Sequence, residues 1–147
     1  MYAMPEFSDS ICAGLFSSAS DVSEIVDESK ILTKENDFVL LINPSKEIEH
    51  RLIPAYINAT IRKARGNMHS DSLSLEILMF VSGTMNIGNA IERSGARGGR
   101  FVMFSSRKEI LDKMVSRFSM KLLKSYNLVL DMGKCGQVAM TAVRDGK

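Results

Sequence analysis

The spacing of apolar and polar positions divides the first half of the chain into alternating helix and strand. Asp21 suits a helix N-cap, and the apolar residues after it recur at helical spacing as far as about residue 35. Residues 38–43 are instead a compact run of apolar β-formers between turn residues, which predicts a buried strand. A long helix follows over residues 45–65, and Pro54 should kink or divide it because proline supplies no amide donor.

The second half of the chain continues this alternation. Helical spacing predicts four further helices, over residues 71–83, 86–94, 105–115 and 120–126. Apolar β-formers predict strands over residues 7–16, 101–104 and 138–143. The helix over residues 86–94 should bury Ile87, Ala90 and Ile91. Together the elements predict a mixed α/β (α+β) fold, a single domain over residues 1–147 in which three or four strands are covered by helices.

Length and composition are those of an ordinary globular protein. The 147 residues suffice for one domain with its own core, and 45% are hydrophobic and 24% charged. The sequence shows no apolar run long enough to span a membrane and no secretion signal. Cys12 and Cys135 form no C-x-x-C pair, so we expect two buried thiols in a reducing, cytoplasmic compartment.

The net charge of +2 conceals an uneven distribution. Residues 1–50 hold three lysines against ten carboxylates, a net charge of −7. Residues 51–124 hold thirteen Lys or Arg against five carboxylates, a net charge of +8. A polyanion could bind the surface that the second block forms. Alternatively, the two blocks neutralise each other across the fold, because asymmetry along the sequence need not become asymmetry in space.

Candidate catalytic groups are few. His50 and His69 do not stand at a metal-binding spacing, and nothing near Cys12 or Cys135 indicates an activated thiol. Glu76 lies inside an otherwise apolar helix, where a carboxylate must be protonated or receive hydrogen bonds. It could be a general base, but amide or arginine donors that fix packing are the favoured interpretation. We expect no metal site, no cofactor and no enzymatic activity.

Basic residues form two groups with the chemistry to bind phosphates. The helix-end group closes the long helix, where the helix dipole alone would favour cations, and consists of Arg62, Lys63 and Arg65. The arginine-turn group surrounds three glycines and consists of Arg93, Arg97 and Arg100. Arginine binds phosphate oxygens in bidentate fashion. Further basic residues should lie on solvated helix faces: Arg107, Lys108, Lys113, Arg117, Lys121 and Lys124.

The glycines of the arginine turn also allow a phosphate-cradling interpretation. Such loops follow a strand and open a helix. Gly95, Gly98 and Gly99 follow a helix and precede a strand, which is the reverse order. We therefore interpret them as turn formers.

One stretch of the chain resembles a known family. The motifs that carry the resemblance are Leu75-Glu76-Ile77-Leu78, Ser82-Gly83, Asn86-Ile87, Ala90-Ile91 and Gly95-Ala96-Arg97-Gly98-Gly99. Their order and spacing resemble the kinase-binding, tRNA-recruiting small subunit of the KEOPS complex, with good coverage from about residue 38 to 105. Where that family has Arg-Gln before isoleucine, this chain has Met85-Asn86. An RNA contact made there must weaken or pass to Arg97 or Arg93.

The resemblance implies a non-catalytic accessory subunit. It would bind the 3′ CCA end of tRNA and the small atypical kinase subunit, and so support threonylcarbamoyladenosine modification of tRNA. The implied tRNA-binding residues are Arg62, Lys63, Arg65, Arg93, Arg97 and Arg100. The expected kinase-binding residues are Leu122, Leu123, Leu128 and Leu130.

The alternative function is a purely protein-binding adaptor. A third hypothesis, an orphan enzyme, would need a pocket that joins Glu76 to a cysteine. On this basis, charge reversal at Arg62 and Lys63 should spare the fold and abolish tRNA binding.

Overall fold

The computed structural model describes residues 7–8, 10–34 and 37–128, and these form one small domain of the predicted mixed α+β class. Its elements follow one another in the order β1 (Cys12–Ser18), α1 (Val22–Leu32), β2 (Val39–Ile42), α2 (Ile48–Ala64), α3 (Leu73–Ser82), α4 (Ile87–Ser94), β3 (Gly99–Ser105), α5 (Lys108–Arg117) and β4 (Lys121–Tyr126). The strand predicted over residues 138–143 lies outside the described residues.

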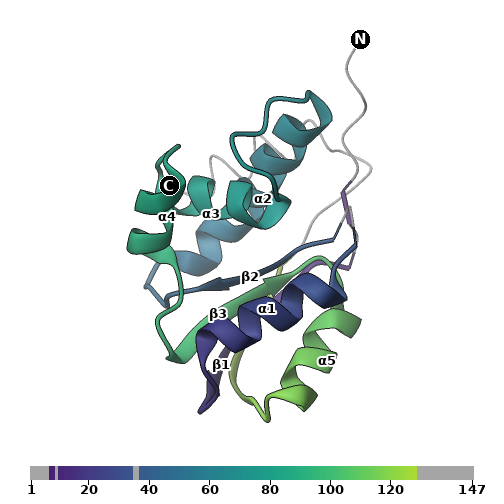
Figure 1. Ribbon diagram of the computed structural model, residues 1–147, viewed down its shortest axis with the longest axis vertical. Helices are drawn as coiled ribbons and strands as arrows, with labels where there is room; N and C mark the ends of the chain where they lie inside the picture. Colours follow the sequence, from purple (N-terminus) through teal and green to yellow (C-terminus); the bar gives the residue numbers. More distant parts are fainter. Residues whose placement is uncertain (1–6, 9, 35–36, 129–147) are drawn as a thin grey trace.

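The four described strands form one sheet in the order β2-β3-β1-β4, and every neighbouring pair is antiparallel. Successive side chains of a strand point to opposite faces, so the sheet supports two cores. Val102 and Phe104 of β3 belong to the core shared with α2 and α3, whereas Phe101 and Met103 belong to the core shared with α1 and α5. Figure 1 shows the resulting layers, with α2, α3 and α4 on one face of the sheet and α1 and α5 on the other.

Several helices begin and end at the residues that the sequence predicts. The carboxylate of Asp21 accepts a hydrogen bond from the amide of Ser23 at 3.0 Å and caps α1. The hydroxyl of Ser72 accepts from the amide of Leu75 at 3.2 Å and caps α3. Gly83 ends α3 with a φ of 73°, a left-handed conformation that glycine adopts without the penalty of a Cβ.

α2 is one helix although it contains Pro54. Of the two predicted effects of Pro54, a kink or a division of the helix, division is therefore excluded. The proline removes one donor, because it cannot bond to the carbonyl of His50. Leu52, Ala55 and Ala59 are buried on the side of α2 that faces the core and hold the helix on both sides of the proline.

The helix predicted over residues 120–126 is wrong, because these residues form the edge strand β4. β4 pairs antiparallel with β1, and the register shifts between Leu15 and Phe16, which face Lys124 and Leu122. Gly14 of β1 makes room for the new strand, since a Cβ there would lie 3.0 Å from Cδ1 of Leu122. Sheet pairing thus overrides a local pattern that also fits a helix.

Two smaller predictions are also wrong. Ile91 was expected to be buried, but its side chain is 51% exposed, whereas Ala90 of the same helix is buried. The helix predicted to start at residue 105 begins only at Lys108, with Arg107 as its N-cap, because the hydroxyls of Ser105 and Ser106 donate to the carbonyls of Arg107 and Phe38. No helix in the described ranges has the length and apolarity that a membrane crossing requires.

Candidate nucleic-acid interface

Glu76 of α3 is completely buried and accepts four hydrogen bonds. Oε1 accepts from the backbone amides of His69 and Ser70 and from the Ser70 hydroxyl, the last at 3.1 Å. Oε2 accepts from Nη1 of Arg62 at 3.3 Å. A carboxylate is tolerated in a core only when it is paired and hydrogen-bonded. These donors confirm the interpretation that Glu76 fixes packing, since it fastens the segment between α2 and α3.

The side chain of Arg62 is held within the fold and is only 21% exposed. Besides Glu76, its Nη1 atom donates to Nδ1 of His69 at 3.2 Å and to the sulfur of Met85 at 3.0 Å. Its Cζ atom lies 4.5 Å from the centre of the Phe80 ring, a cation–π contact. A charge reversal at Arg62 would place two carboxylates together, so the expectation that it spares the fold conflicts with this geometry.

Position 85 is where the family resemblance leads us to expect an arginine. Met85 is 44% exposed, and its sulfur accepts the hydrogen bond from Arg62 of α2. Arg62 of α2 thus contacts the residue at position 85.

The other two residues of the helix-end group face outward to different extents. Lys63 belongs to the last turn of α2 and is half-buried, and Arg65 is the exposed C-cap residue. Both cations stand where the negative end of the helix dipole favours them. Gly66 follows with a φ of 70° and turns the chain away. Of the helix-end group, Arg65 is the residue best exposed to a ligand.

The glycines of the arginine turn act as turn formers, as predicted. Gly98 and Gly99 have φ values of 124° and 71°, which favour glycine. At Gly95 a Cβ would lie 2.6 Å from the carbonyl oxygen of Ile91, so the turn has no space for a larger residue. Arg93, Arg97 and Arg100 are all exposed around this turn.

The arginine turn lies beside the start of α2. Gly95 forms a β-bridge with Ile42, and the amide of Asn43 donates to the carbonyl of Ser94 at 2.8 Å. α2 begins shortly afterwards at Ile48, and its 17 residues span about 25 Å. The helix-end group lies at the other end of this helix, so the structure does not gather the two groups into one cluster. Figure 1 shows the two ends of α2 well separated.

Several basic residues outside the arginine turn are neutralised by carboxylates of the first fifty residues. The pairs, with their N–O distances, are Arg51–Glu47 at 3.4 Å, Arg107–Asp37 at 3.1 Å, Arg117–Glu28 at 3.4 Å and Lys124–Glu49 at 3.8 Å. Three of these cations belong to the basic residues expected on solvated faces. The alternative of internal neutralisation therefore holds for these four cations.

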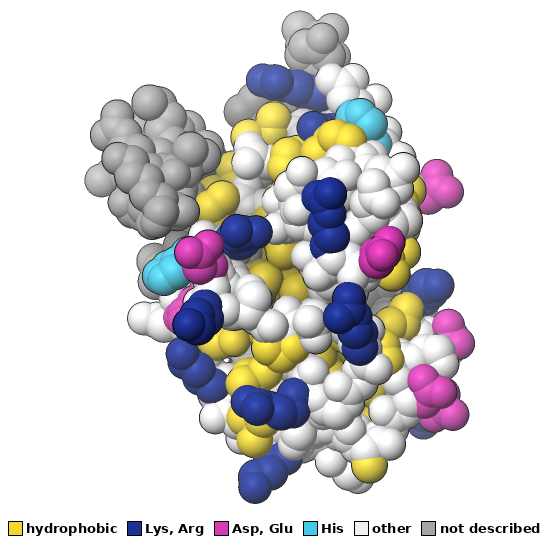
Figure 2. Space-filling model, turned by 90° about the vertical axis from the view of Figure 1, so that its left-hand side faces the viewer, with side chains coloured by type: hydrophobic (Ala, Val, Ile, Leu, Met, Phe, Trp, Pro, Cys, Tyr) yellow, Lys and Arg dark blue, Asp and Glu magenta, His cyan; other side chains and the backbone are white. Residues whose placement is uncertain are grey.

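Four arginines behave differently. Within residues 7–8, 10–34 and 37–128, no carboxylate forms an ion pair with Arg65, Arg93, Arg97 or Arg100. Figure 2 views the molecule from the side of Figure 1 on which α4 lies, and shows Lys and Arg side chains spread along this face with hydrophobic side chains between them. The fold therefore leaves these four arginines without an ion-pair partner among the described residues.

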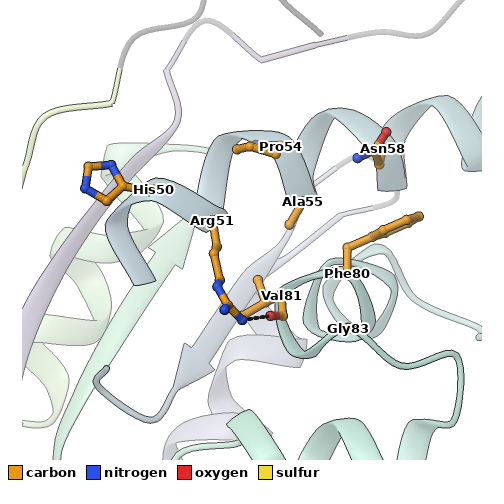
Figure 3. A pocket seen from close by; sticks show the side chains of 8 residues that line it. All are labelled: His50, Arg51, Pro54, Ala55, Asn58, Phe80, Val81 and Gly83. Atoms are coloured by element: carbon orange, nitrogen blue, oxygen red, sulfur yellow. Dashed lines mark hydrogen bonds between the residues drawn. The ribbon is translucent and has the colours of Figure 1, made fainter. Parts of the chain in front are cut away.

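A groove lies between α2 and α3, on the stretch of α2 between the two basic groups. It has a volume of about 240 Å³, and the residues that line it include Arg51, Pro54 and Asn58 of α2 and Phe80 of α3. Nη1 of Arg51 donates to the carbonyl of Val81 at 3.1 Å, which closes one end of the groove. Figure 3 shows Phe80 and Asn58 at the other end, with Pro54 and Ala55 along the wall.

The sequence did not indicate this groove. Phe80 follows Glu76 by one helical turn, so its spacing predicts a core residue of an apolar helix. Its partial exposure results from the packing of α3 against α2, which no local pattern records.

The four leucines expected to bind a kinase are not equivalent. Leu122 and Leu123 of β4 are 51% and 41% exposed, respectively. Leu128 is partly buried against the core shared with α2 and α3. Leu130 lies outside the described residues. A protein surface at this edge would therefore use Leu122 and Leu123 rather than all four.

Cys12 and Glu76 do not share a pocket. Cys12 packs against the core beneath α1 and α5, whereas Glu76 lies on α3 at the opposite face of the sheet. Burial, with a smaller contribution from Asp112, raises the pKa of the Cys12 thiol to about 11. In the described part of the chain, no three His, Cys, Asp or Glu side chains come together as metal ligands. Cys135 lies outside that part.

Comparison with known proteins adds no family assignment. No protein-family model matches the chain, and no curated protein matches it either.

Proposed function

We propose that this protein is a non-catalytic accessory subunit of a KEOPS-type complex, which binds the 3′ end of tRNA and the small atypical kinase subunit. The family resemblance over residues 38–105 supplies the assignment. The structural observation that supports it most is the set of exposed arginines without carboxylate partners among the described residues: Arg65, Arg93, Arg97 and Arg100. The other four arginines of the described ranges pair with carboxylates, but these do not.

The arrangement suits an extended single strand better than a compact anion. The arginine turn and Arg65 lie toward opposite ends of α2, and a small ligand could not reach both. A strand that follows α2 would place successive phosphates near both ends. Arginine is well matched to such phosphates, because its planar guanidinium donates two parallel hydrogen bonds.

Arg62 has a different role in this proposal. Its guanidinium is engaged by Glu76 and lies over Phe80, so it supports the surface rather than binding the phosphate. The kinase would contact a second surface at the edge of the sheet, where Leu122 and Leu123 are exposed. The RNA would then bind α2 and α4, and the kinase would bind β4.

The test compares intact tRNA with tRNA that lacks its CCA end, over a series of salt concentrations. Four engaged phosphates predict that log K falls with log salt at a slope of about −3, because each releases counterions. Charge reversal at Arg97 and Arg100 together should weaken binding strongly and make the slope shallower. The matched control reverses Lys108 and Lys113 on α5, at the other face of the sheet.

The outcomes separate the two functions that the sequence leaves open. Tighter binding of intact tRNA, lost in the Arg97–Arg100 variant and kept in the control, supports an RNA-binding subunit. Equal affinity for both RNAs would overturn recognition of the 3′ end. Binding to the kinase without any RNA binding would instead identify a protein-binding adaptor. Replacement of Leu122 and Leu123 by aspartate should abolish co-purification with the kinase and leave RNA binding unchanged.

A further inference from the structure

Met85 is the methionine that the fold exposes most among the described residues. It is 44% exposed and lies in the segment between α3 and α4. Met68 is half-buried, and the remaining methionines of the described ranges are buried: Met79, Met103, Met114 and Met120. A peroxide oxidises a thioether only where it can reach the sulfur, so exposure distinguishes Met85 from the others.

The sulfur of Met85 is also held by a cation that has other partners. Nη1 of Arg62 donates a hydrogen bond to this sulfur at 3.0 Å. The same nitrogen lies 3.3 Å from Oε2 of Glu76 and 3.2 Å from Nδ1 of His69. An Nη nitrogen carries two hydrogens, so three acceptors share two donors, and the thioether is the weakest acceptor of the three. A change that makes position 85 a stronger acceptor therefore redistributes these hydrogen bonds.

Oxidation of the sulfur is such a change. A hydroperoxide transfers one oxygen atom to the thioether: the O–O bond breaks, an S–O bond forms, the sulfur loses two electrons, and the peroxide leaves as water or an alcohol. The product, methionine sulfoxide, is polar and chiral. Its oxygen accepts hydrogen bonds well, and at the exposed position 85 it remains in contact with solvent. The new oxygen therefore competes for Arg62 without the penalty of burying a polar group.

The existing hydrogen bond also decides which epimer forms. A thioether sulfur has two lone pairs, and addition of oxygen to one or the other gives opposite epimers of the sulfoxide. Arg62 engages one lone pair of Met85, so a peroxide reaches the other. Oxidation in the folded protein should therefore give one epimer rather than a mixture.

We propose that Met85 is a peroxide-sensitive modification site. A hydroperoxide forms one epimer of methionine sulfoxide there, and the new oxygen takes a hydrogen of Arg62 from His69. Glu76 keeps its bond to Arg62, because its carboxylate is completely buried and needs the cation, whereas His69 is exposed to water. The site is independent of RNA binding, since its chemistry needs only the sulfur, the guanidinium and a peroxide.

The first experiment treats the unaltered full chain with a limiting amount of hydrogen peroxide. Trypsin then releases residues 66–93 as one peptide, because no Lys or Arg lies between Arg65 and Arg93. The peptide contains Met68, Met79 and Met85, and tandem mass spectrometry locates the added oxygen. We expect Met85 to be oxidised about tenfold or more faster than Met79, the completely buried internal control. Equal rates for the two methionines would overturn the proposal.

The epimer is identified on the same peptide. Two classes of methionine sulfoxide reductase exist, each specific for one epimer, and each is applied to a separate sample. One class should reduce nearly all of the sulfoxide at Met85 and the other almost none. Protein oxidised in urea is the control, and there each class should reduce about half, because no fixed guanidinium shields the sulfur. An equal division in the folded protein as well would overturn the role of Arg62 in directing the oxidation.

The transfer of the hydrogen bond is tested at His69. Its ring-nitrogen signals in NMR spectra should shift when Met85 is oxidised. The matched control is Met85→Leu, which keeps the size of the side chain and removes the sulfur. Peroxide should leave the His69 signals of this variant in place, even though other methionines are still oxidised. Signals that stay in place in the oxidised unaltered protein would show that His69 keeps its bond, which would overturn the proposed exchange.

Discussion

Arg62 and Glu76 form an ion pair between α2 and α3, with Nη1 of the arginine 3.3 Å from Oε2 of the carboxylate. The sequence assigns the arginine to RNA and the carboxylate to packing, and in the structure both serve packing. Glu76 is completely buried and the Arg62 side chain is 21% exposed, so water screens this pair poorly. The pair closes the α2–α3 connection through the same carboxylate that receives the amides of His69 and Ser70.

We predict that Glu76→Gln destabilises the protein by about 2–4 kcal/mol, because it leaves a buried guanidinium facing an amide donor. Urea unfolding followed by circular dichroism measures the loss as a lower midpoint. The matched control is Glu92→Gln on α4, where the carboxylate is exposed and the change should stay within about 0.5 kcal/mol. Equal midpoints for the two variants would contradict a stabilising role for the pair.

Charge reversal should separate the members of the helix-end group. Arg62→Glu would bring a second carboxylate beside Glu76, so we expect it to lower the melting temperature sharply. Arg65→Glu changes an exposed C-cap residue and should cost about 1 kcal/mol or less, mostly through the helix dipole. Thermal melts and tRNA binding are measured on both variants. A folded Arg62→Glu protein that merely loses RNA binding would show that Arg62 contacts RNA directly.

The sequence predicts those elements whose signals are local. Ser72 and Gly83 bracket α3 because capping and left-handed geometry depend on neighbouring residues alone. The arginine turn is predicted for the same reason, since its glycines occupy backbone conformations that other residues avoid. For these elements, no knowledge of the tertiary structure is needed.

Other features depend on partners that are distant in the sequence. The pair Leu122-Leu123, flanked by lysines, fits a helix equally well, and only pairing with β1 makes it a strand. The role of Arg62 depends on Glu76, which lies 14 positions away on another helix. The groove beside Phe80 exists only because α2 and α3 pack together. The basic groups can be found in the sequence itself. Which of their arginines support the fold and which are exposed depends on such tertiary contacts, so the sequence does not predict it.

The β1–β4 pairing can be tested at Gly14. A Cβ at this position would lie 3.0 Å from Cδ1 of Leu122 and 3.1 Å from the carbonyl oxygen of Lys124. We therefore expect Gly14→Ala to cost about 1–3 kcal/mol through overpacking and to speed hydrogen exchange of the β4 amides. Ser17→Ala, elsewhere on β1, is the control and should leave exchange unchanged. If residues 121–126 were helical, Gly14→Ala would not affect their exchange selectively.

The thiol of Cys12 should react slowly with alkylating reagents at neutral pH. Burial raises its pKa to about 11, and Asp112 adds to the shift, so the protonated thiol predominates below that pH. Only the thiolate reacts. Iodoacetamide should therefore modify Cys12 at pH 8 about 200-fold more slowly in the folded protein than in urea, where the pKa returns to about 8.5. The rate in the folded protein should rise about tenfold per pH unit up to pH 10, as followed by mass spectrometry of the Cys12 peptide. A rate that levels off near pH 9 would show that the thiol is not desolvated.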